Sequence, residues 1–337
     1  MVTFFLTIKN FINGIIAAFM LIPIMLTMGN AGNPDTPVES YPDTGNPYIN
    51  EYLDPDIAAH RSGAGVAPQN TLMAFENIVE QAQDTVDTLE FDVQITKDGE
   101  LVLLHNLTYD ATSNAAEAFG KENVYVSSIT FEEAQVLNLG ENFKRDGEYP
   151  YRGLRGEDIP YNLKVVTCDS IIDYVEANAS KEYKYVIEIK SMGSNGRRAA
   201  DKLYEIITDR GLQERVIWST FDPTLSAYMK ANYSEISRTA DAIEAIQFYF
   251  YYRMGWDLND VSPSYVALQI PYGSSAFDNL INLGTREMIN YAHSYGIALQ
   301  YWTINSEDEV RMLAENGADC IMTDHPQMAY DVVQSCK

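Results

Sequence analysis

Two histidines, one arginine and two carboxylates lie in or directly after short apolar segments near the start of the sequence. His60 and Arg61 follow one such segment, His105 ends another, and Glu90 and Asp92 stand two residues apart in a third. Side chains two residues apart in a strand point to the same side, so these two carboxylates could hold one hard cation between them. This combination of groups suits metal-assisted attack on a phosphodiester.

A later strand-like segment adds a further acidic group and a further cation. In residues 183–190, Glu188 and Lys190 lie on the same side of a run that otherwise reads as buried. An apolar core does not tolerate unpaired charges, so we expect both side chains to face the site and Glu188 to be the third metal ligand. Three carboxylates favour one divalent cation, Mg²⁺ or Ca²⁺ with Mn²⁺ also admissible, over Zn²⁺.

Strand-like and helix-like runs alternate along the chain, which predicts parallel strands joined by crossover helices. The expected strands are residues 57–60, 89–93, 101–105, 185–190, 216–220, 265–270, 299–303 and 320–323. Capping-box patterns at Thr130 and Ser306 predict two helix starts. We therefore predict an α/β fold: a (β/α)8 TIM-type barrel with an N-terminal extension and a segment inserted after the second and third strand region.

Barrels of this kind gather their reactive groups at the carboxyl ends of the strands. The candidate reactive and binding side chains lie at the expected strand ends, namely His60, Asp92, His105, Lys190 and Trp302. The predicted architecture and the predicted chemistry therefore agree.

The same residues resemble a known enzyme family. Residues 60–71 (HRSGAGVAPQNT) are similar, without gaps, to the opening pattern of the glycerophosphodiester phosphodiesterase family, which is His-Arg-Gly, a short loop and Pro-Glu-Asn-Thr. The resemblance covers most of residues 56–333. Its further motifs are LEFDVQITKDG (89–99), LVLLH (101–105), VIEIK (186–190), STFD (219–222), YWTIN (301–305) and GADCIMTD (317–324).

This resemblance implies metal-dependent hydrolysis of glycerophosphodiesters to sn-glycerol 3-phosphate and an alcohol. One imidazole would deprotonate the nucleophile and the other would protonate the departing alcohol, and the sequence leaves open which does which. The implied catalytic residues are His60 and His105. The implied substrate-binding residues are Arg61, Lys190 and Trp302, and the implied metal ligands are Glu90, Asp92 and Glu188.

Three positions depart from the family pattern. Ser62 replaces the first Gly of the opening motif, Gln69 replaces the Glu of Pro-Glu-Asn-Thr, and Asn106 replaces the Asp that follows the second histidine. Gln and Asn keep the shape of the acids but carry no negative charge. The residues expected to act as ligands and acid-base groups are all present, so we expect an active enzyme.

The composition fits one catalytic domain over residues 56–333. The chain has 337 residues, and an α/β barrel needs about 250. The formal net charge of -25 argues against nucleic acid or an anionic membrane surface as a partner. A phosphodiester is also an anion, so the net negative charge of the protein would repel it. Local cations must offset this repulsion, and we therefore expect metal dependence. Three widely spaced cysteines indicate neither a disulfide framework nor a zinc site.

The N-terminal region predicts export. Residues 11–28 are almost entirely apolar, and small residues follow in the spacing of a cleavage site. We interpret residues 1–30 as a signal peptide or membrane anchor and residues 31–55 as a flexible, acidic, Pro-rich linker. The protein would be extracellular or on the cell surface, with membrane contact only through the N-terminal segment if that segment is not cleaved.

Three other features carry weaker predictions. Residues 109–155 are long and polar with one expected helix, and would form a lid or substrate-facing insertion. The aromatic residues of 247–256 could face a lipid, although packing on the barrel exterior is the favoured interpretation. His293 and His325 have no ligand partners nearby in sequence, and a structural role is expected for both.

Three alternatives remain open at this point. A phospholipase D-like enzyme acting on lysophospholipid or sphingomyelin could use the same barrel, His pair and metal. A non-catalytic surface protein that binds glycerophosphoryl groups would account for Ser62, Gln69 and Asn106. A sugar- or nucleotide-binding barrel is least favoured, because residues 322–326 are not Gly-rich.

Overall fold

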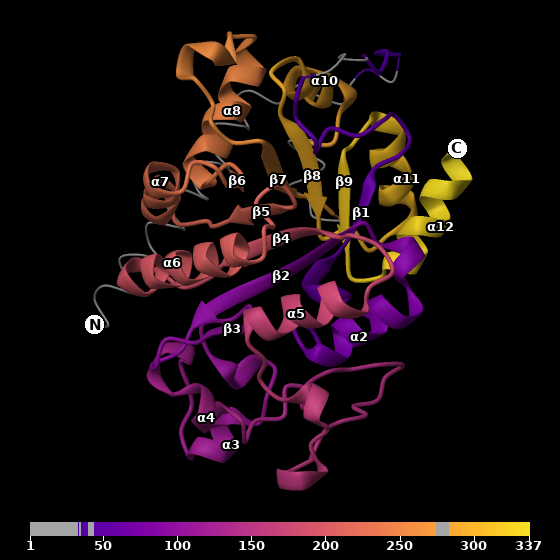
Figure 1. The fold of residues 1–337 in the computed structure, drawn as a ribbon. Helices are drawn as coiled ribbons and strands as arrows, with labels where there is room; N and C mark the ends of the chain where they lie inside the picture. The colour runs from indigo at the N-terminus through magenta and orange to yellow at the C-terminus, as the bar shows by residue number, and fades with distance from the viewer. Residues whose placement is uncertain (1–32, 34, 40–43, 274–282) are drawn as a thin grey trace.

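Eight parallel strands form the framework of the molecule (Figure 1). The computed structural model describes residues 33, 35–39, 44–273 and 283–337. Its strands are β1 (Asp56–Ala59), β2 (Thr88–Ile95), β3 (Leu101–Leu103), β4 (Lys184–Ile189), β5 (Val216–Ser219), β6 (Ser237–Arg238), β7 (Ala267–Pro271), β8 (Ala298–Trp302) and β9 (Cys320–Thr323). The order β6-β5-β4-β2-β1-β9-β8-β7 follows the chain around a barrel. A parallel bridge from Thr239 to Ala267 brings its two edges together.

The predicted barrel is confirmed, but two of its strands were not identified correctly. Residues 101–105 were expected to form a barrel strand, whereas β3 pairs antiparallel with β2 and lies off the barrel path. The turn Thr96-Lys97-Asp98-Gly99 joins two adjacent strands, and so short a connection permits only an antiparallel pair. The eighth barrel strand is instead β6, which has two residues and was missed.

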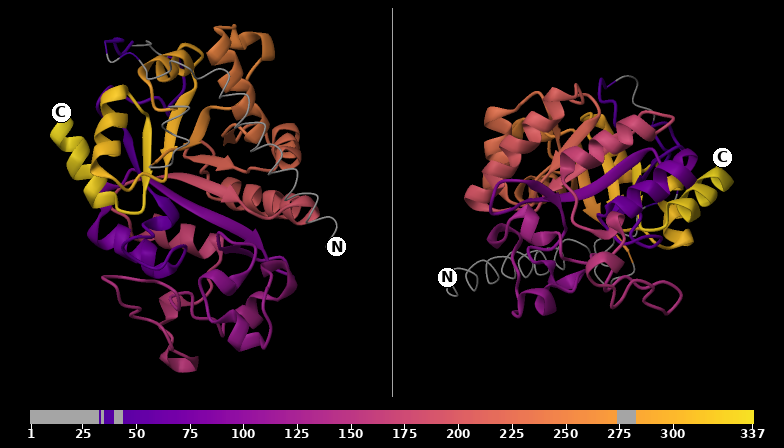
Figure 2. Two further views of the ribbon diagram at one scale, coloured as in Figure 1. Left: turned by 180° about the vertical axis from the view of Figure 1, so that it is seen from behind. Right: turned by 60° about the horizontal axis from the view of Figure 1, so that its bottom comes forward.

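Helices surround the strands (Figure 2). The α-helices are α2 (Leu72–Gln81), α3 (Ala115–Phe119), α4 (Phe131–Ala134), α5 (Cys168–Asn178), α6 (Gly193–Asp209), α7 (Pro223–Asn232), α8 (Ala242–Met254), α10 (Arg286–Ser294), α11 (Glu307–Asn316) and α12 (Pro326–Cys336). The 3-10 helices are η1 (His60–Ser62), η2 (Gln83–Thr85), η3 (Tyr109–Ala111), η4 (Val126–Ser128), η5 (Gly156–Asp158), η6 (Tyr161–Leu163) and η7 (Leu258–Val261).

Local sequence explains where several helices begin. Thr71 caps α2 by accepting a hydrogen bond from the backbone of Ala74, and Thr130 begins α4 in a complete capping box with Glu133. Ser306 precedes α11 as predicted, but its side chain makes no capping hydrogen bond. The capping box expected there is therefore wrong, although the helix start is right.

Side chains alternate between the barrel interior and the helix-covered exterior. The interior cluster comprises Tyr48, Ala58, Val186, Ile217, Ala267, Ala298, Cys320 and Met322. Two larger clusters fill the space between strands and helices on the two sides of the barrel. Because the interior positions recur every second residue, the polar residues that follow them along each strand face inward at the carboxyl ends.

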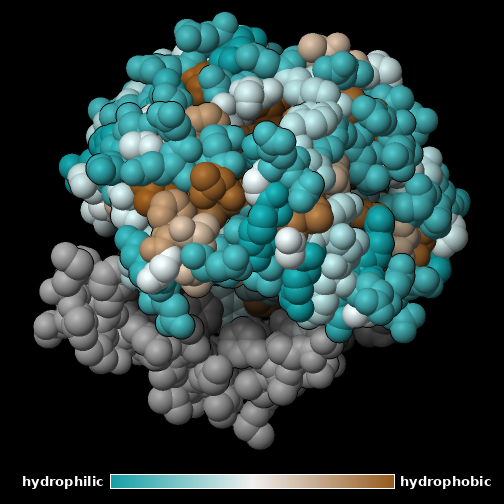
Figure 3. Space-filling model, turned by 90° about the horizontal axis from the view of Figure 1, so that it is seen from below, coloured by the Kyte–Doolittle hydropathy of each residue, from teal (hydrophilic) through white to brown (hydrophobic). Residues whose placement is uncertain are grey.

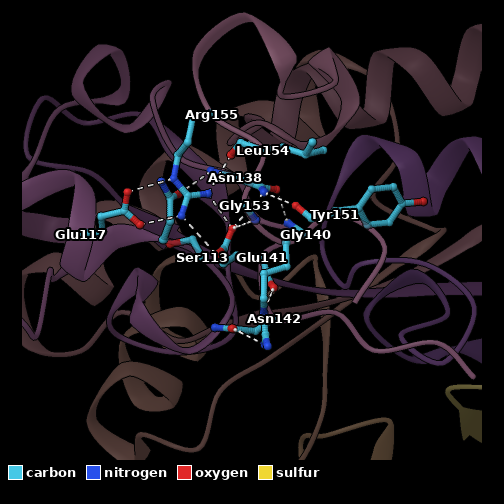
Figure 4. Close-up of polar contacts among 12 residues, drawn as sticks. Ser113, Glu117, Asn138, Gly140, Glu141, Asn142, Tyr151, Gly153, Leu154 and Arg155 are labelled. Atoms are coloured by element: carbon cyan, nitrogen blue, oxygen red, sulfur yellow. Dashed lines mark hydrogen bonds and ion pairs between the residues drawn. The ribbon is translucent and has the colours of Figure 1, made fainter. Parts of the chain in front are cut away.

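The segment between β3 and α5 has an apolar core of its own. This cluster runs from Val102 to Val165 and includes residues of α4 and of the loops around η3 and η4. Figure 4 shows a polar network beside it, in which the Arg155 guanidinium donates to both Glu117 and Glu141. The predicted insertion over residues 109–155 is thus an ordered subdomain, with two short α-helices instead of the one that was expected, and it lies below β3 in Figure 1.

The segment expected to be a flexible linker packs against the barrel wherever it is described. Asn46 donates to the carbonyls of Val266 and Gly296, and Asn50 donates to Asp319. Tyr48 is 4% exposed and joins the interior cluster. Side-chain amides that satisfy barrel backbone groups give this Pro- and Asn-rich stretch a fixed path.

The predicted signal peptide or anchor, residues 1–30 with the apolar run 11–28, lies outside the described residues. Within the part of the chain that is described, no helix has both the length and the apolar character to cross a membrane. The aromatic helix α8 packs Phe248 and Tyr249 into the molecule, which matches the favoured interpretation of that segment. Seen from below, the surface is mostly hydrophilic with small separate apolar groups (Figure 3).

Candidate active site

Two strands bring the predicted acidic residues together at the carboxyl end of the barrel. In the parallel pairing of β2 with β4, Asp92 lies directly beside Glu188. Lys190 Nζ lies 3.2 Å from Asp92 Oδ1 and 2.6 Å from Glu188 Oε1. Asp92 is 1% exposed. A buried carboxylate needs a positive partner, and the ammonium group of Lys190 provides it.

The loop after β1 carries Arg61 to the same carboxylates. The backbone N–H of Arg61 donates to Glu90 Oε2 over 2.6 Å, and its Nε lies 3.7 Å from Asp92 Oδ2. Arg61 Nη1 donates to Gln69 Oε1 over 2.7 Å. Gln69 thus keeps the hydrogen bond that a Glu would make there, without its charge. Ser62 adopts a φ of 62°, a left-handed conformation that explains why Gly suits this position.

His60 is oriented by an acid that the sequence analysis did not assign to the site. His60 Nδ1 lies 2.7 Å from Asp324 Oδ1. An ionised carboxylate only accepts hydrogen bonds, so Nδ1 carries the proton and Nε2 faces away from Asp324. Asn305 donates to the other oxygen, Asp324 Oδ2, over 2.7 Å. The sequence signal was present, since Asp324 directly follows a strand and lies in a family-like motif.

His105 reaches the site from outside the barrel strands. The backbone N–H of Leu104 donates to the Asp92 carbonyl, which places His105 beside β2. His105 Nδ1 lies 3.1 Å from Asn106 Oδ1. An amide oxygen accepts, so this contact also directs the proton to Nδ1 and leaves the Nε2 lone pair available in the neutral ring.

The two imidazoles have opposite electrostatic environments. Burial alone would lower the pKa of His60, but the hydrogen bond to Asp324 and the nearby charges of Glu90 and Asp324 outweigh it and raise this pKa above its ordinary value. Burial lowers the pKa of His105 and Asp92 raises it in part. The cations Lys190 and Arg61 lower it again, so that the net pKa is below the ordinary value.

The two cations do not stabilise the three carboxylates equally. Burial and the charge of Asp92 raise the pKa of Glu90 well above its ordinary value. Burial raises the pKa of Glu188, with Lys190 opposing and Asp92 assisting. Burial also raises the pKa of Asp92, but Lys190, His105 and Arg61 outweigh it and lower this pKa.

These carboxylates are the chemical donors that a hard divalent cation prefers, and the two largest causes that raise the pKa of Glu90, burial and the charge of Asp92, are ones that an added cation would oppose. Within the described chain, no group of three or more His, Cys, Asp or Glu side chains is arranged closely enough to hold a metal ion. Lys190 lies between Asp92 and Glu188 instead. The donor set therefore fits a cation in chemistry, while the arrangement of the side chains is that of an ion-paired cluster.

Two aromatic rings lie beside the charged cluster. The ring centroids of Phe221 and Trp302 are 6.0 Å apart, edge to face, and Lys190 Nζ lies 5.7 Å from the Phe221 centroid. Phe221 is the second residue after β5 and is 52% exposed. Trp302, predicted from the sequence, thus lies near the charged cluster, and Phe221 is an addition that the sequence analysis had quoted without assigning it a role.

The remaining histidines make structural contacts. His293 Nε2 lies 2.8 Å from the buried carboxylate of Asp319, which also accepts from the backbone of Leu299. The His325 ring lies so close to Gly65 that a Cβ added there would overlap it at 2.2 Å. Both contacts agree with the structural roles that were predicted.

Known proteins resemble this chain in sequence and in fold. A curated protein of Caldanaerobacter subterraneus subsp. tengcongensis, named glycerophosphodiester phosphodiesterase, is 28% identical over 280 residues, which cover 82% of this chain and 97% of that protein. The crystal structure of a glycerophosphodiester phosphodiesterase from Agrobacterium tumefaciens has a TM-score of 0.61 at 18% identity, covering 82% of this chain and all of that one.

A phosphodiesterase from Oleispira antarctica, solved in complex with the product sn-glycerol-3-phosphate, has a TM-score of 0.60 at 18% identity, covering 83% of this chain and 97% of that one. These two structures support the barrel fold. Residues 60–328 match the family described as the glycerophosphoryl diester phosphodiesterase family. Since this match spans the barrel from His60 to α12, the chain belongs to the glycerophosphoryl diester phosphodiesterase family.

Proposed function

We propose that this protein hydrolyses glycerophosphodiesters to sn-glycerol 3-phosphate and an alcohol, with His60 as general acid and His105 as general base. Phosphodiester hydrolysis as the class of activity follows from family membership. The observation that carries the assignment of the two imidazoles is their hydrogen bonding: His60 is bonded to the carboxylate of Asp324, whereas His105 is bonded to the neutral amide of Asn106.

The charged cluster provides the binding site for the phosphate. Arg61 and Lys190 are the cations that face the strand ends, and both are partly shielded from water, which strengthens their interaction with an anion. A divalent cation bound by Glu90, Asp92 and Glu188 would supply further charge stabilisation at a phosphate oxygen. Negative charge that develops on phosphorus oxygens in the transition state is then stabilised by groups already in place.

The proton transfers follow from the tautomers. His105 Nε2 accepts a proton from the nucleophile, which is water or the adjacent glycerol hydroxyl, as the new P–O bond forms. If the glycerol hydroxyl attacks, the cyclic phosphate that results is opened by water in a second step, in which the two imidazoles exchange roles. His60, protonated at both nitrogens, donates the Nε2 proton to the alcohol oxygen as the old P–O bond breaks. The raised pKa of His60 favours its protonated form and the lowered pKa of His105 favours its neutral form, which are the forms that these two roles need.

Two relatives support the choice of substrate. The Caldanaerobacter protein carries the name glycerophosphodiester phosphodiesterase, and the Oleispira protein was solved with sn-glycerol-3-phosphate. The exposed edges of Phe221 and Trp302 offer the apolar surface against which glycerol carbons would pack. We propose in addition that the protein acts outside the cytoplasm, because residues 11–28 have the composition of an export signal or anchor.

The deciding experiment measures release of sn-glycerol 3-phosphate from glycerophosphocholine, glycerophosphoethanolamine and glycerophosphoglycerol with Mg²⁺, Ca²⁺ or Mn²⁺, and after EDTA treatment. We expect turnover that needs a divalent cation and falls at least about 100-fold in Asp92→Asn. His293→Gln serves as the matched control, since His293 lies outside the site, and it should retain turnover in the molecules that fold.

Two outcomes would contradict the proposal. Preferential release of choline from lysophosphatidylcholine or sphingomyelin would identify a phospholipase D-like enzyme. Binding of glycerophosphocholine without turnover under any of the three cations would identify a glycerophosphoryl-binding protein. Full activity after EDTA treatment would remove the metal from the mechanism while leaving the His pair.

A further inference from the structure

Three neutral polar side chains in the barrel interior have no place in the chemistry described above. Ser219, Gln269 and Gln300 each stand two residues after a member of the interior cluster, namely Ile217, Ala267 and Ala298. Since side chains of a strand alternate, all three point into the barrel, one layer nearer to the carboxyl ends. They belong to β5, β7 and β8, whereas the charged residues of the site come from or follow β1, β2, β3, β4 and β9.

The hydrogen bonding of this polar group is incomplete. Gln269 Nε2 donates to Gln300 Oε1 over 3.1 Å. Within the described residues, Gln269 Oε1 and Gln300 Nε2 form no other hydrogen bond, and Ser219 Oγ has no partner at all. Gln300 is 4% exposed and Ser219 is 5% exposed. Of these atoms, Ser219 Oγ is fully buried without a partner within the described residues, which is costly, whereas Gln269 is only partly buried. A ligand hydroxyl that pairs with Ser219 Oγ and with the free amide atoms would therefore bind here favourably.

The position of the group connects it to the site. Ser219 is the direct neighbour of Glu188 in the pairing of β4 with β5. Phe221 and Trp302, whose rings meet edge to face, stand two residues after Ser219 and Gln300 respectively. The polar group therefore lies beneath the aromatic pair and beside the charged cluster, where the part of a substrate next to the phosphate would reach it.

We propose that Ser219, Gln269 and Gln300 bind the hydroxyl groups of the glycerol moiety. This inference rests on the proposed function and adds the subsite that selects the glycerol. The chemistry is complementary, because glycerol hydroxyls both donate and accept. Gln300 Nε2 would donate to one hydroxyl, Gln269 Oε1 would accept from one, and Ser219 Oγ can do either. The C–H face of the glycerol would meet the aromatic rings.

This placement has a consequence for the other half of the substrate. With the glycerol held inside the barrel, the leaving alcohol lies toward the solvent side of the phosphate. The neutral amides offer no counter-charge to a choline or ethanolamine ammonium group, so the subsite distinguishes the two halves of the diester. Selectivity should therefore be strict for the glycerol and weak for the alcohol.

The test compares two ligands that differ only in the hydroxyl groups, sn-glycerol 3-phosphate and propyl phosphate. Their dissociation constants are measured by calorimetry with Mg²⁺ present, for the wild-type protein and for Gln300→Met, which keeps the chain length but removes the amide. We expect the wild type to bind the glycerol compound at least about tenfold more tightly, and Gln300→Met to lose about tenfold for that ligand alone. Propyl phosphate should bind both proteins equally.

Two further variants secure the result. Gln247→Met makes the same exchange at an exposed position of α8 and should change neither affinity. Ser219→Ala removes only one oxygen, and decides the question if Gln300→Met does not fold. It should weaken binding of sn-glycerol 3-phosphate severalfold without affecting propyl phosphate.

Equal losses for both ligands in the variants, or a wild type that does not distinguish the ligands, would overturn this inference. Either result is distinct from failure of the proposed function, which would appear as a wild-type protein that releases no sn-glycerol 3-phosphate from glycerophosphocholine. A protein that turns over the diester but ignores the hydroxyls of the product contradicts the subsite alone.

Discussion

His60 Nδ1 and Asp324 Oδ1 lie 2.7 Å apart, and this pair joins the first and last strands of the barrel. Asp324 stabilises the protonated imidazole and fixes which nitrogen faces the substrate. The contact connects the last strand to the proposed general acid, although Asp324 lies 264 residues from His60 in sequence.

Replacing Asp324 by Asn should impair catalysis more than binding. The amide carries no negative charge and can present its N–H to His60, which favours the wrong tautomer. We expect kcat to fall by roughly 10²- to 10⁴-fold with KM little changed, and the alkaline limb of the pH profile to move to lower pH because the pKa of His60 falls. Steady-state kinetics across pH measure both effects. An unchanged alkaline limb would show that Asp324 does not act through His60.

Asn106→Asp should move the acid limb of the activity profile. Asn106 already raises the pKa of His105 slightly through its hydrogen bond, while burial and two cations lower it. A carboxylate at this position would favour the protonated ring more strongly, so that the base is lost at a higher pH. We expect the acid limb of kcat/KM to shift upward by about one pH unit. A shift of the alkaline limb instead would reverse the acid and base assignments.

Ser62→Gly should stabilise the protein. Ser62 has a φ of 62° and its hydroxyl is buried without a partner in the described residues. Gly adopts this conformation without a steric penalty and removes the unpaired oxygen, although it also makes the unfolded chain more flexible. The expected gain in the free energy of unfolding is about 1 kcal/mol, measured by urea denaturation. Ser62→Ala, which keeps the Cβ, should gain less.

Glu244→Gln should destabilise the barrel wall near β6. Glu244 accepts two hydrogen bonds from Arg238, at 2.6 and 2.7 Å. Burial raises the pKa of Glu244, but the hydrogen bonds and charge of Arg238 outweigh it and lower the pKa. The loss of this partner from the buried Arg238 should cost about 3 kcal/mol at pH 7.

The stabilisation by Glu244 has a defined pH range. A carboxyl group with a lowered pKa in the folded state contributes fully above its unfolded pKa, which is about 4.3. The contribution is lost as the pH falls through the folded pKa. The difference in stability between the wild type and Glu244→Gln should therefore shrink below about pH 4. A constant difference between pH 7 and pH 3 would show that the charge of Glu244 is not the cause.

The sequence was sufficient to predict the barrel and most of the site because the informative residues follow apolar strands. Alternation places Glu90 and Asp92 on one side, and the register of β2 with β4 places Glu188 directly beside Asp92. The misassigned strand shows what alternation and composition do not predict, which is the partner of a strand. Residues 101–105 have the composition of a barrel strand, and only the length of the preceding turn distinguishes an antiparallel partner.

Other features depend on contacts that have no local signal. The two-residue strand β6 is too short for any periodicity to reveal it. Asp324 follows a strand and lies in a family-like motif, but its pairing with His60 becomes visible only from their closeness in space. Residue types alone also do not determine that Lys190 lies between Asp92 and Glu188 and balances their charge.

The side chain of Tyr48 enters the barrel interior from the chain that precedes β1. The hollow of the barrel is thus filled from one end by a residue outside its eight repeating units, while the other end remains available to substrate. A shortened protein that starts at Asp56 would leave Ala58 and Met322 open to water from beneath. The residues before β1 are therefore as necessary to the packing of the barrel interior as the strands themselves.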